Sequence, residues 1–274
     1  AVARTYVSAR GTDIVVSQLS VESGQLHESR LLDLVDERTA CVVVQQPDFF
    51  GHIRDLDGLA EAVHERGALL IVAVADPTSL GLLKTPGAWG ADIAVAEGQP
   101  LGLPLQYGGP WAGLMACRPE HIRQLPGRIA GQTTDDQGRR GFVLTLQARE
   151  QHIRREKATS NICTSQTLLA IGITAYLSLL GPEGLREVAR QSHAKAAYFA
   201  SRAPSGYRVL TPPPFYNELL LECPVPPDEL RKRLLEHEIL GGVPVEHGLL
   251  LAFTEQNSKE EIDRLVAALE EVGR

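Results

Sequence analysis

The sequence predicts an α/β protein in which a large domain with a mostly parallel sheet precedes a small α+β domain. Three observations support this prediction. Short apolar runs rich in Val, Ile and Ala alternate with amphipathic helical segments in the first half of the chain. A long helical stretch is interrupted at Gly181-Pro182, which separates a partial large domain at 1–181 from residues 182–274. Beyond Pro204, Pro-rich turns, short strands and helices follow in a different order.

The expected elements of the large domain follow from the spacing of apolar residues. Between Asp55 and Arg66 these residues recur at helical spacing on one face, and Gly67 is placed to end that helix. The apolar runs around it are short and β-branched, as in buried parallel strands. This strand–helix–strand order favours a doubly wound parallel sheet. The expected strands are Ile14–Leu19, Cys41–Val44, Ala68–Asp76, Ala91–Val95, Trp111–Cys117 and Phe142–Leu146.

Residues 182–274 are expected to form a connecting helix and the small α+β domain. The long helical stretch covers Thr164–Leu180 and continues over Pro182–Ala203. Ser258 and Glu261 have the spacing of a capping box, which opens the last helix. The other expected elements are a strand at Glu218–Cys223, a helix at Asp228–His237 and a strand at Leu249–Phe253.

Composition excludes several functional classes. With 274 residues and a net charge of -7, the chain lacks the surplus of Lys and Arg that general nucleic-acid binding requires. Apolar runs such as Ala68–Ala75 are shorter than the roughly 20 residues needed to span a bilayer, so no membrane insertion is expected. The histidines lack metal-ligand spacing, and no metal site is expected. Four scattered cysteines without a CxxC pair indicate free thiols in a reducing cytoplasm.

The most informative positions are Asp76 and Gln99. Asp76 ends the predicted strand Ala68–Asp76, and the next strand runs into Gln99 and a Gly/Pro-rich loop at 100–113. In fold-type I pyridoxal-phosphate (PLP) enzymes, one strand ends in an Asp that holds the pyridine nitrogen, and the next ends in the Schiff-base Lys. Gln has no nucleophilic amine, so Gln99 cannot form an imine. Asp76 could equally be a turn former before Pro77.

A basic segment at 139–157 precedes a hydroxyl-rich turn, Ala158–Asn161, and a helix expected from about Thr164. Helix N-termini present free N–H groups, so together with the nearby cations this pattern favours an anion site. The alternative is a solvated basic face with Glu150 and Glu156 as local counter-charges. The basic residues of the segment are Arg139, Arg140, Arg149, Arg154, Arg155 and Lys157.

Four segments together resemble the P-protein of the glycine cleavage system, the PLP-dependent decarboxylating glycine dehydrogenase. They are Ala73–Gly113, Gln124–Arg128, Arg139–Phe142 and Ala148–Gln166, of which the last is the most distinctive. The resemblance covers essentially the whole chain and is to the N-terminal half of the fused enzyme, or to subunit 1 of the two-subunit form. It implies a fold-type I PLP-transferase-like large domain whose opening part lies outside this chain.

The resemblance also implies a division of labour between subunits. This chain would be a non-catalytic subunit with no catalytic residue and no covalently bound PLP, and the lysine-bearing subunit 2 would carry the PLP. Their cytoplasmic heterotetramer would decarboxylate glycine and pass the aminomethyl group to the lipoyl H-protein. Ala158–Asn161 resembles a Gly-Thr-x-Asn turn of related enzymes, which implies that Thr159 and Asn161 contact the PLP phosphate of the partner. The basic segment has a second candidate role in docking the H-protein.

Two other functions remain open at this stage. The chain could be a self-sufficient PLP enzyme that uses Lys84 or Lys157 to form the imine. Lys84 lies between the two strands that end at Asp76 and Gln99, and Lys157 lies in the basic segment, so neither ends a strand beneath a cofactor. The chain could also be a structural or regulatory scaffold with a vestigial pocket.

Overall fold

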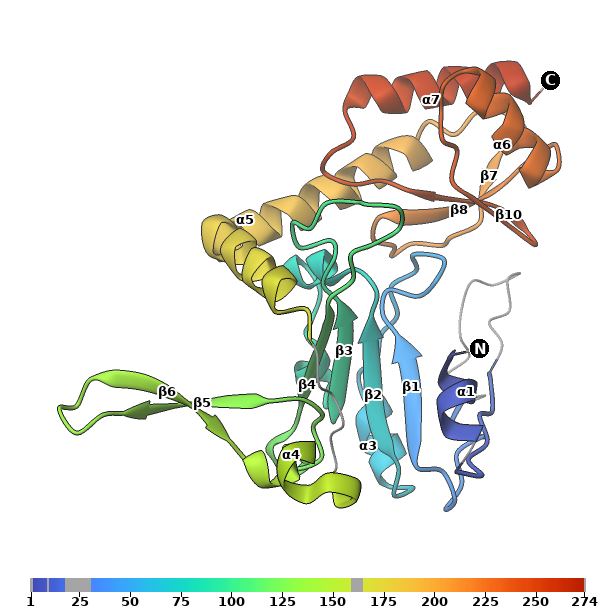
Figure 1. Ribbon diagram of the computed structural model, residues 1–274. Helices are drawn as coiled ribbons and strands as arrows, with labels where there is room; N and C mark the ends of the chain where they lie inside the picture. The colour runs from blue at the N-terminus through green and yellow to red at the C-terminus, as the bar shows by residue number, and fades with distance from the viewer. Residues whose placement is uncertain (1, 9, 18–30, 159–164, 274) are drawn as a thin grey trace.

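A computed structural model describes residues 2–8, 10–17, 31–158 and 165–273. Figure 1 shows the larger sheet, a second sheet above it that is covered by helices, and a hairpin that extends away from both. The architecture is α/β with a mixed, mostly parallel larger sheet, followed by a small α+β unit, as the sequence predicts. The domain boundary between residues 181 and 182 stays a prediction; two helical segments meet there at a kink.

The larger sheet has the strand order β1–β2–β3–β4. The first three strands pair in parallel, and β4 is antiparallel to β3. Two short 3₁₀ helices, η1 (Pro77–Gly81) and η2 (Pro86–Trp89), connect β2 to β3. The strands are β1 (Cys41–Gln45), β2 (Leu69–Val74), β3 (Ile93–Glu97) and β4 (Gly113–Cys117).

Helix α3 (Leu59–His64) covers one face of this sheet. Val42 and Val44 of β1 are buried against it, whereas Val43, which points to the other face, is 59% exposed. Alternation of this kind places one face of β1 in the core and leaves the other open. The face that carries Val43 is therefore open in the described part of the chain.

The prediction of a strand at Ile14–Leu19 is wrong for the described residues of that range. Ile14–Ser17 has no strand structure, and the remainder of the expected range lies outside the described residues. Val15 and Val16 are exposed, and the described sheet begins at β1, so nothing shown pairs with this segment. β-branched residues favour a strand only when a neighbouring strand and a packed face support it. Helix α1 (Val2–Ser8) precedes the segment.

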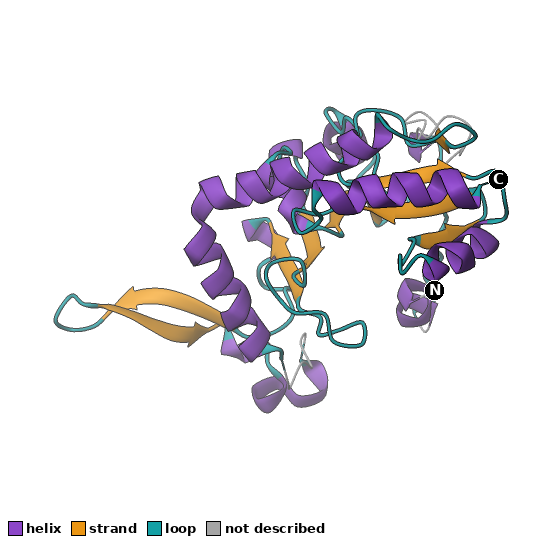
Figure 2. Cartoon of the chain, turned by 90° about the horizontal axis from the view of Figure 1, so that it is seen from above, coloured by secondary structure: helices purple, strands orange, loops and turns teal. Residues whose placement is uncertain are grey.

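A two-stranded hairpin of β5 (Ile129–Thr134) and β6 (Arg140–Thr145) projects from the body of the molecule, as Figure 2 shows from above. The strand expected at Phe142–Leu146 is thus present, but in this hairpin and not in the main sheet. Phe142, Val143 and Leu144 are all exposed. The short elements around its base are η3 (Pro119–His121), η4 (Gln147–Arg149), α4 (Gln151–Arg154) and η5 (Arg155–Lys157).

Helix α5 (Thr167–Ala200) is interrupted at Gly181, whose φ of 61° and ψ of -174° break the helix before Pro182. By length and composition this helix is a candidate to cross a membrane. An 18-residue window in it has a mean hydropathy of 1.5, and 6% of that window is buried inside the protein. This differs from the expectation based on continuous apolar runs, because Gly, Thr and Ser separate its Leu and Ile residues. One such helix is weak evidence for a span. Its packing against η1 and the helix at 259–272 ties α5 to the globular part.

The smaller unit packs two helices on an antiparallel sheet of order β7–β8–β10–β9. Ser258 Oγ accepts a hydrogen bond from Glu261 N, and the Glu261 carboxylate accepts one from Ser258 N, so the predicted capping box is confirmed. The elements are β7 (Arg208–Val209), β8 (Glu218–Glu222), β9 (Val243–Val245), β10 (Gly248–Ala252), α6 (Pro227–Glu236) and α7 (Lys259–Val272).

Candidate functional site

Asp76 and Gln99 lie at neighbouring strand ends, as the sequence pattern predicts. The parallel register of β2 and β3 ends with Val74 opposite Ala96, and Asp76 and Gln99 follow these two strands at the carboxyl edge of the sheet. Ligands of open α/β sheets bind at this edge. The two residues therefore lie where a cofactor binds in this kind of sheet. Whether they can hold a cofactor depends on the residues around them.

The carboxylate of Asp76 is fully engaged by the protein itself. Its Oδ1 accepts hydrogen bonds from Thr78 N (3.0 Å) and Thr78 Oγ1 (2.6 Å), and its Oδ2 accepts one from Asn217 Nδ2 (3.3 Å). Thr78 Oγ1 also lies 2.8 Å from the buried Tyr216 hydroxyl. Burial raises the pKa of Asp76 despite these hydrogen bonds. Asp76 thus caps the turn that begins at Pro77 and also connects the larger sheet to the smaller unit, because Tyr216 and Asn217 come from the segment before β8.

The Gly-rich loop after β3 is closed and filled. Glu97 Oε1 accepts hydrogen bonds from Gln99 N (3.0 Å) and Ala112 N (2.8 Å), which pins the two ends of the loop together. A Cβ on Gly98 would lie 2.6 Å from Ile173 Cδ1, and a Cβ on Gly102 would lie 2.5 Å from the Tyr176 ring. Helix α5 therefore packs directly on the glycines, in the space beside the strand end.

These surroundings do not fit a PLP bound covalently by this chain. Gln99 supplies no amine, and its Nε2 is buried without a hydrogen-bond partner among the described atoms. Lys84, one of the two lysines considered from the sequence, bonds Asp57 at the surface. Lys157 lies beside α4, at the base of the hairpin. Neither lysine follows a strand of the main sheet, so the geometry gives no support to a self-sufficient PLP enzyme.

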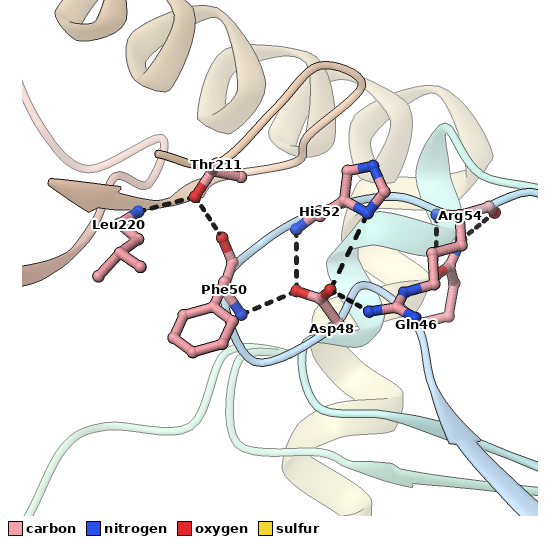
Figure 3. Close-up of polar contacts among 7 residues, drawn as sticks. All are labelled: Gln46, Asp48, Phe50, His52, Arg54, Thr211 and Leu220. Atoms are coloured by element: carbon pink, nitrogen blue, oxygen red, sulfur yellow. Dashed lines mark hydrogen bonds and ion pairs between the residues drawn. The ribbon is translucent and has the colours of Figure 1, made fainter. Parts of the chain in front are cut away.

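A polar network after β1 joins the two units, and the sequence reasoning did not find it (Figure 3). Buried Asp48 accepts hydrogen bonds from Phe50 N (2.8 Å), His52 N (3.1 Å) and Arg54 Nη2 (2.6 Å). Phe50 O, in the loop that Asp48 shapes, accepts a hydrogen bond from Thr211 Oγ1 of the smaller unit (2.7 Å). The only sequence signal was a run of polar residues directly after a predicted strand.

Backbone hydrogen bonds add to this joint, the contact between the loop after β1 and the smaller unit. Tyr216 N donates to Gly51 O (2.9 Å), and Ile53 N donates to Pro214 O (2.8 Å). Gly51 has φ 81°, and a Cβ there would lie 2.0 Å from Glu218 O, so only glycine fits this approach. The hydrogen bonds fix the small unit against the end of β1.

Glu218, at the start of β8, makes the stability of this joint depend on pH. Burial, with the negative charges of Asp76 and Asp48, raises the pKa of Glu218 to about 7 from its ordinary 4.5. Because the folded-state pKa is raised, the folded protein binds the proton more tightly. The stabilisation is complete below pH 4.5 and is lost as pH rises through 7.

We expect Glu218→Gln to stabilise the protein at pH 8 by about 1–3 kcal/mol, because the variant no longer buries a carboxylate. Urea unfolding at pH 4.5 and pH 8 measures the effect, which should vanish at the lower pH. Glu222→Gln is the matched control on the same strand. Its exposed carboxylate is paired with Arg208, which lowers its pKa, so no gain at pH 8 is expected. Equal effects of the two substitutions would contradict the assignment.

Thr159 and Asn161, the cofactor-contacting residues predicted from the sequence, lie outside the described residues. The preceding basic segment is described, and its cations lie in two places. Arg139 and Arg140 lie in the hairpin, whereas Arg149, Arg154 and Lys157 line a cavity beside α4. Arg123 also lines this cavity, and the sequence reasoning missed it because Arg123 precedes the hairpin and lies outside the basic segment.

One cluster among the described residues has metal-ligand chemistry, although the sequence predicted none. The ligand atoms of Asp92, Glu120 and His121 lie within 4.8 Å of one another. Asp92 is already bonded by Leu70 N (2.7 Å) and His64 Nε2 (2.8 Å). Although burial opposes ionisation, these bonds hold the pKa of Asp92 below its usual value. The Asp92 carboxylate thus has a structural role at the start of β3.

Comparison with known proteins decides the family. The sequence profile described as glycine cleavage system P-protein matches residues 1–269. The chain belongs to this family. A probable glycine dehydrogenase (decarboxylating) subunit 1 of Chlorobium luteolum is 47% identical over 277 residues, covering 99% of this chain and 62% of the relative. The protein of the same description from Thermomicrobium roseum is 48% identical over 280 residues, covering 98% and 62%. This P-protein family member thus spans about three-fifths of the length of the curated relatives it matches.

Solved structures show the same relationship. The crystal structure of a glycine decarboxylase (P-protein) of the glycine cleavage system, in inhibitor-bound form, matches with a TM-score of 0.90 and 46% identity, covering 99% of this chain and 62% of that one. A NifS-like protein matches with a TM-score of 0.70 and 16% identity, covering 98% of this chain and 70% of that one, which shows the fold alone. The fold is that of the fold-type I PLP-dependent enzymes, and the P-protein resemblance is confirmed.

Proposed function

We propose that this P-protein family member is the non-catalytic, lysine-lacking subunit of a glycine decarboxylase of the glycine cleavage system. A homologous lysine-bearing subunit 2 holds the PLP, decarboxylates glycine and passes the aminomethyl group to the lipoyl H-protein. The observation that carries the proposal is the altered strand end. Gln99 has no amine, Asp76 bonds Thr78 and Asn217, and Tyr176 packs on the loop.

Exposed apolar side chains support a partner subunit. Leu168, Ile171 and Leu179 of α5 are 79%, 60% and 88% exposed, and their spacing places them on one side of the helix. Phe142, Val143 and Leu144 of the hairpin are also exposed. In Figure 1 the first half of α5 and the hairpin lie on the same side of the molecule, away from β1. Apolar surface of this kind marks a protein interface.

Reconstitution tests the proposal directly. The chain is co-expressed with a homologous subunit that carries the strand-end lysine, and glycine–bicarbonate exchange is measured with and without this chain. We expect exchange only with both subunits, and borohydride should trap PLP on the partner alone. Trapping of PLP on Lys84 or Lys157 of this chain would show a self-sufficient enzyme. Full exchange by the partner alone would indicate a scaffold with a vestigial pocket.

Thr159 is the second test, because we propose that Thr159 and Asn161 contact the PLP phosphate of the partner. Thr159→Ala should weaken PLP binding by the complex about tenfold, since a hydrogen bond to a charged phosphate contributes roughly 1.5 kcal/mol or more. PLP affinity is measured by absorbance titration of the resolved complex. Thr174→Ala is the control, because the bond of Thr174 Oγ1 in the described part of the chain is to Ala170 O of its own helix. Unchanged affinity after Thr159→Ala would refute the contact.

The H-protein is proposed to dock on the basic segment 139–157. Attraction between exposed charges is screened at high ionic strength. H-protein binding to the assembled complex should therefore weaken from 50 to 500 mM salt, on the order of tenfold or more. Surface plasmon resonance over this range measures the effect, and salt-independent binding would place the docking surface elsewhere.

A further inference from the structure

Three potential metal ligands meet at the edge of the larger sheet that is opposite Asp76 and Gln99. The ligand atoms of Asp92, Glu120 and His121 all lie within 4.8 Å of one another. Asp92 immediately precedes β3, and the amino end of β3 points away from the smaller unit in Figure 1. The cluster is therefore separate from the candidate cofactor site, which lies at the carboxyl ends of β2 and β3.

The pairing of β3 with β4 brings these residues together. The two strands are antiparallel, and directly beyond their paired residues Arg118 N donates to Asp92 O (2.9 Å). η3 begins at the next residue, and His121 N donates to Arg118 O (3.0 Å), which closes the short turn that carries Glu120 and His121. Backbone hydrogen bonds thus hold both side chains beside Asp92.

The Asp92 carboxylate is fixed through one oxygen and leaves the other for a ligand. The side chain is 4% exposed, and its Oδ2 accepts a hydrogen bond from Leu70 N (2.7 Å) and lies 2.8 Å from His64 Nε2. Its Oδ1 accepts no hydrogen bond among the described residues. Arg118 Nη1 is 3.6 Å from this oxygen, and Nη2 of the same guanidinium donates to Gly90 O (2.7 Å). Metal-binding carboxylates are commonly oriented by hydrogen bonds to the other oxygen, and a cation would use the acceptor capacity of Oδ1.

The side chains of Glu120 and His121 are available to complete the site. Neither makes a hydrogen bond or an ion pair within the described part of the chain, and Glu120 is exposed whereas His121 is half-buried. Two carboxylates and one imidazole form a mixed set of oxygen and nitrogen ligands. Such a set suits a first-row divalent ion such as Zn²⁺, whereas Mg²⁺ and Ca²⁺ take oxygen ligands. The two carboxylates also outnumber the Arg118 guanidinium, which leaves the cluster with net negative charge.

We propose that Asp92, Glu120 and His121 bind a first-row divalent metal ion, with water in the remaining position. Asp92 supplies Oδ1 from the buried side, and Glu120 and His121 close over the ion from the exposed side. The ion joins η3 to the amino end of β3, and His64 keeps the Asp92 carboxylate in place. This site goes beyond the proposed subunit function and does not depend on it.

Calorimetric titration of the chelator-treated, tag-free chain with Zn²⁺ tests the proposal. One high-affinity site is expected, and His121→Ala should weaken it at least about tenfold, because the variant lacks the nitrogen ligand. Arg118→Gln should strengthen binding at least about threefold, because a positive charge 3.6 Å from Asp92 Oδ1 repels the ion. Co²⁺ is the second probe, and its absorbance should lack the charge-transfer band of a cysteine ligand, although the chain has four cysteines.

His247→Ala is the matched control. His247 follows Glu246 as His121 follows Glu120, and its Nε2 lies 4.0 Å from the Glu246 carboxylate, but no third ligand group of the described residues completes a cluster there. This substitution should change the Zn²⁺ affinity by less than about twofold, because a zinc site needs three or four protein ligands. Circular dichroism confirms that each variant is folded. The proposal would be overturned by the absence of saturable binding, by an equal loss in the control, by weaker binding after Arg118→Gln, or by a cysteine band in the Co²⁺ spectrum.

Discussion

Replacing Leu168, Ile171 and Leu179 together by serine is expected to prevent assembly with the lysine-bearing subunit while leaving this chain folded. Each leucine or isoleucine that becomes buried contributes about 1.5–3 kcal/mol. The triple variant should therefore lose about 5 kcal/mol of association free energy, more than a thousandfold in Kd. Analytical ultracentrifugation of the mixed subunits measures the change, and glycine–bicarbonate exchange should fall with it.

The small unit provides the control for this experiment. Leu235 and Leu240 are also exposed, at 58% and 90%, but they lie in α6 and the loop after it. Replacing both by serine should leave the affinity unchanged within about threefold, because they lie outside the proposed interface. If the triple variant assembles normally, or if the control is equally impaired, the first half of α5 is not the subunit interface.

Replacing Asp48 by alanine is expected to destabilise the chain by about 3–5 kcal/mol. The substitution leaves the largely buried Arg54 guanidinium without its carboxylate and removes the acceptor for Phe50 N and His52 N. The Asp48 loop also carries the contact between Thr211 and Phe50, so the joint between the two units should loosen. Urea unfolding measures the free energy, and hydrogen exchange at residues 50–53 should show the local opening.

Asp36→Ala is the matched control, because it also removes an aspartate that pairs with an arginine and accepts a backbone hydrogen bond. The Asp36–Arg38 pair is exposed at both side chains, so a much smaller loss of stability is expected than for Asp48→Ala. A loss of similar size for both substitutions would show that burial of Asp48 contributes little. The contrast therefore isolates the effect of burial from the effect of charge pairing.

The sequence predicted much of this fold because many elements depend on local patterns. Short β-branched apolar runs located β1, β2 and β3, and the capping box at Ser258 located the start of α7. The same reasoning failed at Ile14–Ser17, where Val15 and Val16 have high strand propensity but no described neighbouring strand. A strand requires a partner, and periodicity alone does not reveal whether one is present.

The candidate site was predicted only in part for the same reason. Gln99 and Asp76 were recognisable, because each follows a strand directly. The sequence could not show that Asn217, 141 residues after Asp76, bonds the Asp76 carboxylate. It also could not show that Arg123 joins Arg149 and Lys157 around one cavity. These contacts join residues that are far apart in the sequence and meet only in the folded chain.

The sequence by itself determined the family and the absence of a Schiff-base amine at Gln99, because both are properties of residue identity and order. Only the tertiary structure shows which side chains fill the space beside Gln99. Ile173 and Tyr176 of α5 pack on Gly98 and Gly102. Residue chemistry is local, but the filling of a site depends on side chains that only the folded chain brings together.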